Sequence, residues 1–445
     1  MTGSPTAARQ VLTGGTVLTM NARRDLIADA AIVLDGPVIA YVGAASGVRV
    51  EPADIRVDCR GLLLMPGLVN AHTHTAMGLY RGLAEDRPRS GWAPARYALP
   101  HLERARPEDY YHGALVGAVE MLLNGVTTIA DRGGSMDVMA EALDAAGIRA
   151  VVAHTLHDID RPLELERARR VLARWGTDPR ARVHAGLGPH APDTCSDALL
   201  RQVRALAGDS GARIYIHCAQ SDLELATVRA RGYAGAVHCL HGHGILGPDV
   251  VAAHCLYLGA GEIALLAATG TWVAHCPASN AKIEARIAPV AAMLAAGVGV
   301  ALGTDWAPTN NTMDLFDEMK TAGLLGKVAA DDAAAIPAAR LLEMATVDGA
   351  RALGLADVCG SLEPGKRADI VALAMDELHL HPWHDVAANL VYAAKGQDVR
   401  HVWVDGRRLV RDRRPVHVDT AALREETTRI WRRLGAAPRD PRARG

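Results

Sequence analysis

Apolar and polar positions alternate in a regular rhythm along the central part of the chain. Stretches whose apolar positions recur every three to four residues, such as 109–125 and 197–208, indicate amphipathic helices. Between them lie eight apolar runs of strand length: 68–75, 126–133, 148–156, 182–192, 213–220, 250–258, 271–280 and 298–306. Eight strand–helix units within about 300 residues predict an α/β fold, a (β/α)8 TIM barrel.

Shorter β-rich pieces broken by turns flank this region on both sides. They occupy 10–20, 30–43 and 56–65 before the predicted barrel, and 366–373 and 399–412 after it. We therefore expect one composite β-sandwich domain built from both chain ends. The predicted division is a β-domain at 1–64 and 364–420, the barrel at 65–363, and a helix with an Arg-rich tail at 421–445.

Composition narrows the class of protein. Lys and Arg number 48 against 50 Asp and Glu, so the net charge of −2 favours binding to neither nucleic acid nor an anionic membrane. The first residues lack a signal-peptide pattern and no apolar run reaches membrane-spanning length, which makes the cytoplasm the expected location. The seven cysteines form no CxxC pair, so we expect buried core residues rather than a disulfide framework or a thiolate zinc site.

A polar side chain, usually a histidine, stands near the end of each predicted strand. These residues are His72, His74, Asp131, His154, His190, His217, His254, His275 and Asp305. Each alone could be an ordinary hydrogen-bonded core group, and His72 with His74 could be two solvated histidines. In a TIM barrel, however, the C-terminal strand ends converge on the active site. Because alternate strand residues face one side, His72 and His74 also suit a shared metal ion.

Five segments in order resemble the amidohydrolase superfamily: PGLVNAHTHT, YIHCAQ, VVAAHC, HCPASN and GTDW. The closer resemblance is to the branch of guanine, cytosine and S-adenosylhomocysteine deaminases and triazine hydrolases. It implies a homo-oligomer, a dimer or tetramer, and one divalent metal ion per chain, Zn²⁺ or Fe²⁺. The implied ligands are His72, His74, His217 and Asp305. A single metal is implied because His190 stands where other branches carry a metal-bridging carboxylated lysine.

The same resemblance implies catalytic roles. Asp305 would accept the proton of the attacking water, and His254 would donate a hydrogen bond to the nucleophile or the developing oxyanion. The branch normally carries Glu three residues after the histidine of strand five, but here Gln220 follows His217. An amide cannot transfer a proton at neutral pH. In one interpretation the substrate is activated enough to react with hydrogen bonding from Gln220 and proton transfer through Asp305. In a second, Glu284 replaces the acid. In a third, the protein has lost hydrolytic turnover and binds its ligand or carries out different chemistry.

Several residues on the predicted loops are candidate substrate contacts. Glu284 and Arg286 stand where the branch has small residues, although they could simply pair with each other at the surface. Trp306 follows Asp305 directly and could form an aromatic wall for a flat ring. The remaining candidates lie in the long first loop or at strand ends: Tyr80, Trp92, His101, His190 and His275.

The predicted function is metal-dependent hydrolysis of a C–N bond in a small nitrogen heterocycle, most simply deamination. One alternative keeps the ring but removes a halide or an alkylamine. The other is a non-catalytic ligand-binding protein on the same scaffold, which only Gln220 favours.

Overall fold

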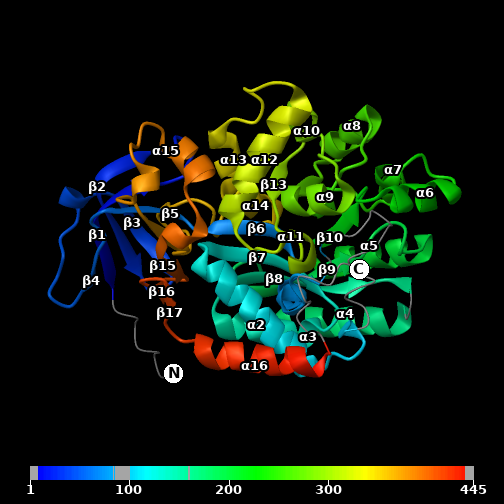
Figure 1. Ribbon diagram of the computed structural model, residues 1–445, viewed down its shortest axis with the longest axis horizontal. Coiled ribbons are helices and arrows are strands. Elements are labelled where there is room, and N and C mark those ends of the chain that lie inside the picture. The colour runs from blue at the N-terminus through cyan, green and yellow to red at the C-terminus, as the bar shows by residue number, and fades with distance from the viewer. Residues whose placement is uncertain (1–8, 84, 86–100, 159–160, 436–445) are drawn as a thin grey trace, which may run out of the picture.

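The computed structural model describes residues 9–83, 85, 101–158 and 161–435, and its centre is a parallel eight-stranded barrel (Figure 1). Each strand pairs with the next one along the chain, so the strand order follows the sequence. The strands are β6 (Leu68–Thr73), β7 (Val126–Gly133), β8 (Arg149–Leu156), β9 (Val183–Pro189), β10 (Ile214–Cys218), β11 (Val250–His254), β12 (Trp272–His275) and β13 (Val300–Leu302). The predicted TIM barrel is confirmed.

The first and last strands meet beside the residues predicted to bind metal. Thr73 and Asp305 form a parallel bridge just beyond β13, and the Asp305 backbone N–H donates to the His72 carbonyl over 3.0 Å. Two residues before His72 in β6, the Asn70 side-chain amide donates to Thr304 Oγ1 over 2.8 Å. The barrel seam therefore holds His72 and Asp305 next to each other.

Helices follow the barrel strands and surround the barrel. They are α2 (Pro107–Leu123), α3 (Met136–Ala146), α4 (Arg161–Trp175), α5 (Asp197–Ser210), α6 (Asp222–Ala230), α7 (Ala236–Gly242), α8 (Ala260–Thr269), α9 (Pro277–Glu284), α10 (Val290–Ala295), α11 (Ala307–Asn310), α12 (Leu315–Ala330), α13 (Ala338–Met344) and α14 (Val347–Ala352). Helix α9 lies at the mouth of the barrel. Helix α5 shows how the sequence sets the ends of a helix. Ser196 caps its N-terminus, and Gly211 ends it in the left-handed region.

One segment differs from its predicted structure. Residues 276–280 continue an apolar run and 280–289 read as a loop, but the chain turns into α9 at Pro277. Proline fits the first helical turn, where its missing N–H costs no hydrogen bond. As a result Ser279, Asn280 and Glu284 are presented by a helix that begins directly after β12.

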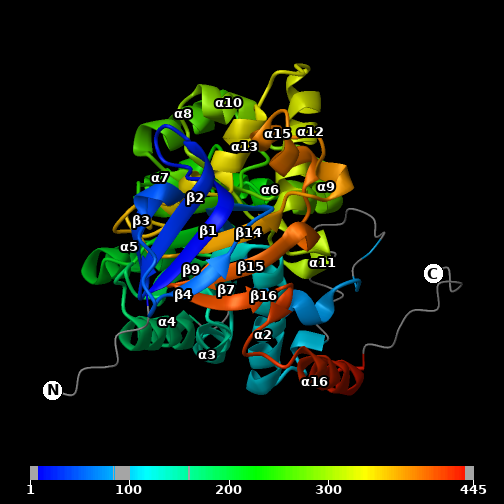
Figure 2. The ribbon, with the colours of Figure 1, turned by 90° about the vertical axis from the view of Figure 1, so that its left-hand side faces the viewer.

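The two chain ends form one hydrogen-bonded sheet, which Figure 2 shows facing the viewer. Its strands are β1 (Gln10–Leu18), β2 (Leu26–Asp35), β3 (Val38–Ala44), β4 (Ile55–Asp58), β5 (Leu62–Pro66), β14 (Ile370–Ala374), β15 (Val399–Val404), β16 (Arg407–Arg411) and β17 (Arg414–Pro415). Central strand β5 pairs with β1 on one side and β14 on the other. The predicted composite domain is confirmed, although its strands belong to one continuous sheet.

A buried ion pair joins this sheet to the barrel. The Arg149 guanidinium at the start of β8 donates to Asp369 over 2.7 Å and to Asp405 over 2.5 Å. Helix α16 (Thr420–Arg433) packs along α2, where Arg433 pairs with Asp109. All seven cysteines are buried and unbridged, as expected. Among the described residues, every helix is too short or too polar to cross a membrane.

Candidate active site

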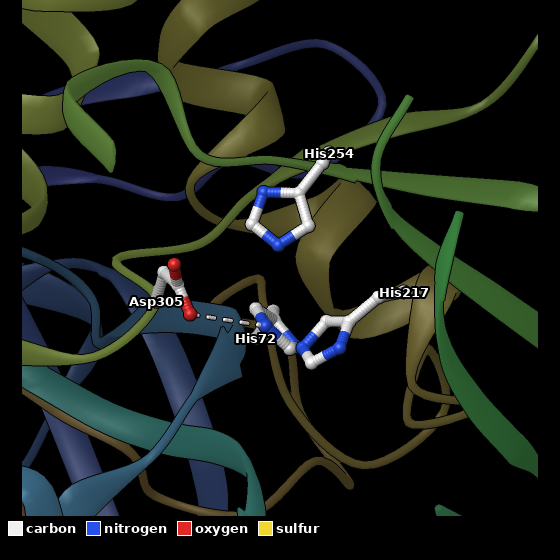
Figure 3. A group of neighbouring side chains, drawn as sticks. All are labelled: His72, His217, His254 and Asp305. Atoms are coloured by element: carbon white, nitrogen blue, oxygen red, sulfur yellow. Dashed lines mark ion pairs between the residues drawn. The ribbon is translucent and has the colours of Figure 1, made fainter. Parts of the chain in front are cut away.

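Four buried side chains converge at the C-terminal mouth of the barrel (Figure 3). His72 comes from β6, His217 from β10 and His254 from β11, and Asp305 follows β13. One ligand atom of each lies within 4.8 Å of those of the other three. His74 joins them from the side, with its Nε2 3.4 Å from Asp305 Oδ1.

The two oxygens of Asp305 have different environments. Oδ2 accepts hydrogen bonds from Ser279 Oγ over 2.6 Å and from Thr309 Oγ1 over 3.2 Å. Oδ1 lies 3.4 Å from Nε2 of both His72 and His74. Burial alone would raise the pKa of this carboxyl, but the contacts to the two histidines outweigh burial and hold the pKa well below its usual value. Asp305 is therefore an ionised carboxylate.

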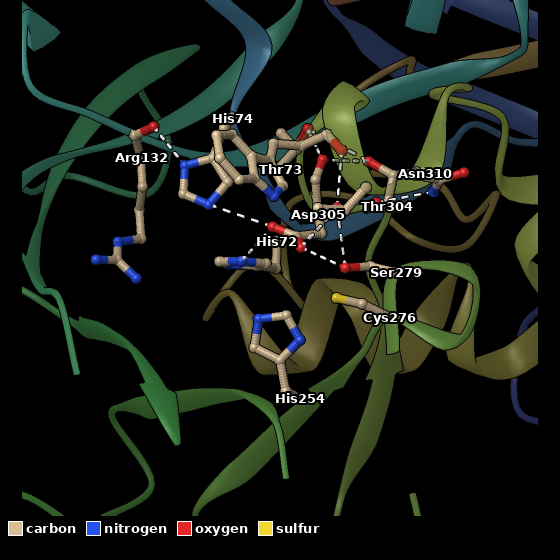
Figure 4. Close-up of polar contacts among 12 residues, drawn as sticks. His72, Thr73, His74, Arg132, His254, Cys276, Ser279, Thr304, Asp305 and Asn310 are labelled. Atoms are coloured by element: carbon tan, nitrogen blue, oxygen red, sulfur yellow. Dashed lines mark hydrogen bonds and ion pairs between the residues drawn. The ribbon is translucent and has the colours of Figure 1, made fainter. Parts of the chain in front are cut away.

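The proton on His74 can be placed from its partner. Its Nδ1 lies 3.0 Å from the Arg132 backbone carbonyl, which can only accept, so Nδ1 carries the hydrogen (Figure 4). In the neutral form of the ring, the lone pair is then on Nε2, 3.4 Å from Asp305 Oδ1. Two electron-pair donors facing each other without a proton suit a cation between them.

His217 supports the same conclusion. Both of its ring nitrogens are buried and find no hydrogen-bond partner among the described residues, and the same holds for His72 Nε2. Burial lowers the pKa of His72 to about 3 and that of His217 well below its usual value, so both rings are neutral. Neutral imidazoles and one carboxylate are the ligand set of a divalent metal.

The chain reaches this mouth through unusual backbone conformations. His254 has φ +75°, Asp305 +58° and Ala219 +50°, although none is glycine. Left-handed conformations of such residues cost free energy and persist where the surrounding structure enforces them. Here the Asp305 N–H bond to His72 and the Ala219 N–H bond to Glu224, 2.8 Å long, hold two of the three turns.

A cavity of about 330 Å³ opens above the cluster. Its lining includes two groups of residues: Arg132, Thr155, His157, Glu164 and Arg167 from β7 to α4, and Ser279, Asn280, Ile283, Glu284 and Trp306 from α9 and the segment after β13. This volume suits a small ring compound rather than a polymer.

Comparison with known proteins agrees with this geometry. Residues 63–409 match the model of the amidohydrolase family. A 5'-deoxyadenosine deaminase of Methanosarcina mazei is 39% identical over 430 residues, covering 96% of this chain and 98% of the relative. The chain belongs to the amidohydrolase family.

Solved structures of amidohydrolase-like proteins superpose closely on this chain. A zinc-bound adenosine deaminase from Xanthomonas campestris has a TM-score of 0.92 at 33% identity, covering 98% of this chain and all of that one. A zinc complex of atrazine chlorohydrolase from Arthrobacter aurescens has a TM-score of 0.89 at 25% identity, covering 95% of this chain and all of that one. The protein is thus an amidohydrolase with a divalent-metal site at the buried His/Asp cluster.

Most of the residues predicted at the site do meet there. Those that line the cavity are His74, His190, His217, Gln220, His254, Glu284, Asp305 and Trp306, with His72 beneath them. Glu284 is buried and accepts the Tyr257 hydroxyl over 2.6 Å, whereas the Arg286 guanidinium lies 4.7 Å over the Tyr257 ring. The two residues therefore contact Tyr257 and do not form the simple surface pair considered from the sequence.

Four predicted substrate contacts lie elsewhere. Tyr80 is buried against Ile430 and Leu434, and the Nδ1 atom of His101 lies 3.0 Å from the Leu434 carbonyl, so both anchor the region of α16 instead of lining the cavity. Arg286 and the buried His275 are also absent from its walls, as far as the described residues go. Trp92 lies outside the described residues.

Two predicted strand-end residues are structural. Asp131 accepts hydrogen bonds from the Thr75 N–H over 2.9 Å and from Thr75 Oγ1 over 2.5 Å, which fixes the segment after β6. His154 Nε2 contacts Glu164 Oε2 at 2.5 Å.

Several cavity residues were missed from the sequence, among them Ser279, Asn280 and Arg132. Ser279 and Asn280 lie in the HCPASN segment, whose Pro277 signals a helix start that would have aimed them inward. Arg132 directly follows Asp131, and a charged residue at the end of an apolar strand was the available signal.

Proposed function

We propose that this amidohydrolase hydrolytically deaminates an amino-substituted nitrogen heterocycle of the adenine type, using one zinc ion per chain. The observation that carries the proposal is the meeting of His72, His74, His217 and Asp305 beneath a cavity of ring-compound size. The similarity to deaminases of adenosine and 5'-deoxyadenosine supports the choice of ring.

The metal, when bound, supplies a Lewis acid that lowers the pKa of a water molecule towards neutrality. His72, His74 and His217 would hold it together with Asp305, whose Oδ2 is fixed by Ser279. Asp305 takes a proton from the attacking water.

His254 is placed to assist. Its Nδ1 contacts Asn280 Oδ1, an acceptor, so the neutral ring carries its hydrogen on Nδ1 and presents a lone pair from Nε2. The ring first accepts a proton and donates a hydrogen bond only afterwards. This order refines the donor role predicted for His254 from the sequence.

Gln220 takes the place of a proton-transferring acid. Its backbone N–H donates to Glu224 over 2.8 Å, and its Nε2 is buried without a partner among the described residues. An amide N–H left over at the cavity wall is suited to a ring nitrogen or oxygen of the substrate. We infer that the substrate is activated enough to react with hydrogen bonding alone.

Gln220 also favours a second candidate, removal of a halide from such a ring. A halide leaves without being protonated, so the missing acid matters less. The resemblance to atrazine chlorohydrolase supports this alternative.

One assay separates the candidates. The zinc-loaded protein would be incubated with adenosine, 5'-deoxyadenosine, 4-aminopyrimidine and 6-chloropurine riboside, and ammonia and chloride release would be measured. Ammonia release that Asp305→Asn reduces by about 10³-fold or more supports deamination. Chloride release alone supports the halide candidate. If Asp305→Asn retains activity within a few-fold of wild type, the assigned base is wrong.

A further inference from the structure

A buried arginine in the active-site cavity has no acidic partner among the described residues. Arg132 stands at the C-terminal end of β7, is 1% exposed and lines the cavity. Figure 4 shows its side chain extending past His74 to the level of His72. The only hydrogen bonds of its guanidinium to described residues are long: 3.5 Å from one terminal nitrogen to the His190 carbonyl and 3.4 Å from the other to the Gly188 carbonyl. Its Nε has no acceptor among those residues.

Arg149 is the other fully buried arginine of the described residues, and unlike Arg132 it has carboxylate partners. Arg149 is held by the carboxylates of Asp369 and Asp405. A buried guanidinium with no carboxylate partner is costly, because the charge loses its hydration without compensation. Burial lowers the pKa of Arg132 only to about 10, so the group remains a cation at neutral pH.

The acidic groups of the cavity are already engaged. Glu164 contacts His154 at 2.5 Å and Arg167 at 2.9 Å. Glu284 accepts the Tyr257 hydroxyl. Asp305 is occupied by two hydroxyls and two imidazoles, and a divalent metal there would add to the positive charge near Arg132.

Gln220 adds a second unused donor to the same cavity. Gln220 Nε2 and Arg132 Nε are both buried donors without an acceptor among the described residues. Both residues line the cavity. A glutamate at position 220 would repel an anion, whereas glutamine donates to it. Both residues therefore favour the same kind of ligand.

We propose that the substrate is anionic, with a negatively charged oxygen on or beside the reacting ring that pairs with Arg132. A carboxylate substituent or an ionised ring oxygen would supply it, and the guanidinium fork matches either. This inference rests on the proposed function and narrows its substrate class, since the unmodified adenosine ring carries no such charge.

Matched pairs of ligands test the proposal. The pair for the carboxylate is 4-aminopyrimidine-5-carboxylate and its 5-carboxamide. The pair for the ring oxygen is isoguanosine, whose ring ionises in alkali, and adenosine, whose ring does not, each measured at neutral and alkaline pH. Binding to zinc-loaded protein would be followed by calorimetry, and turnover by ammonia release.

Wild type should bind the anionic member of at least one pair about 10- to 100-fold more tightly. Arg132→Met should abolish the preference, and Arg132→Lys should keep part of it. Arg170→Met is the matched control, since Arg170 is exposed on α4 and pairs with Glu166; it should keep the full preference.

Equal binding of both members by wild type would overturn the proposal even if Arg132→Met failed to fold. So would an undiminished preference in Arg132→Met, or an equal loss in Arg170→Met. Ammonia release that is equally fast from the neutral and the anionic member of each pair, in wild type and in Arg132→Met alike, would refute the inference while the proposed function stands. Arg132-dependent anion binding without ammonia release from any ligand would support the inference and refute the function.

Discussion

Asn280 Oδ1 lies 2.9 Å from Nδ1 of His254, and this contact decides which nitrogen of the ring faces the cavity as a base. Asn280 is presented by α9, and His254 stands at the end of β11 in a left-handed conformation. The turn into α9 at Pro277 therefore orients a residue on a neighbouring strand.

Replacing Asn280 should impair turnover without removing the metal. Asn280→Leu loses the acceptor that fixes the His254 tautomer, so we expect kcat to fall about 10- to 100-fold. KM and zinc content should stay within a few-fold of wild type, and Asn280→Asp should restore part of kcat. Steady-state kinetics with metal analysis check this. A parallel loss of zinc would mean that Asn280 supports metal binding instead.

Metal content should be one equivalent per chain and should depend on His217. His217→Ala removes a buried ligand nitrogen, so bound zinc should fall to near zero after dialysis, measured by elemental analysis. His243→Ala is the control, because His243 belongs to a separate group with Asp197 and Cys239. Two tightly bound zinc ions in wild type, or a loss in His243→Ala, would refute the single-site assignment.

Gln220→Glu should favour neutral aminopurines at the expense of the native substrate. The new carboxylate can protonate a ring nitrogen, so ammonia release from neutral aminopurines should rise by about 10²–10⁴-fold. Binding of the native substrate should weaken, because an ionised carboxylate accepts hydrogen bonds but does not donate them. Gln220→Leu, which only removes the donor, separates the two effects. Higher native activity with Glu would contradict the hydrogen-bonding role of Gln220.

The ion pair between barrel and sheet should matter for stability. Arg149→Met leaves Asp369 buried without its cation, which costs about 3–5 kcal/mol of the free energy of unfolding. Denaturant titration measures the change. Arg174→Met, which removes an exposed partner of Glu141, should change it by less than about 1 kcal/mol.

Acid should destabilise the protein partly through His184. Burial, with the nearby Arg149 charge, lowers the pKa of His184 to about 4, below its unfolded value of 6.5. Its contribution is therefore complete above pH 6.5 and is lost as pH falls towards 4, by up to about 3 kcal/mol. His184→Gln should show a shallower fall in unfolding free energy over this range. Equal slopes in both proteins would exclude His184 as a source.

The barrel could be predicted because each strand is a compact apolar run and parallel strands bring their polar ends together. The convergence of parallel strand ends correctly grouped His217 and Asp305, which are far apart in sequence. It could not assign Tyr80 or His101, because an irregular segment has no periodicity to show which side chains turn inward. Arg132 was hidden for another reason: its lack of an acidic partner is a property of packing, invisible until β8 and β9 are placed around it.

Strand β5 has a consequence for how the chain folds. Its two neighbours in the sheet are β1, which precedes it closely, and β14, which begins only at residue 370. While the barrel is being synthesised, one edge of β5 stays without its partner, and exposed edges of this kind attract strands of other chains. Closing the sheet requires contacts between distant parts of the sequence, which slows folding. A shortened chain that ends before β14 should therefore aggregate even though it contains every residue of the metal cluster.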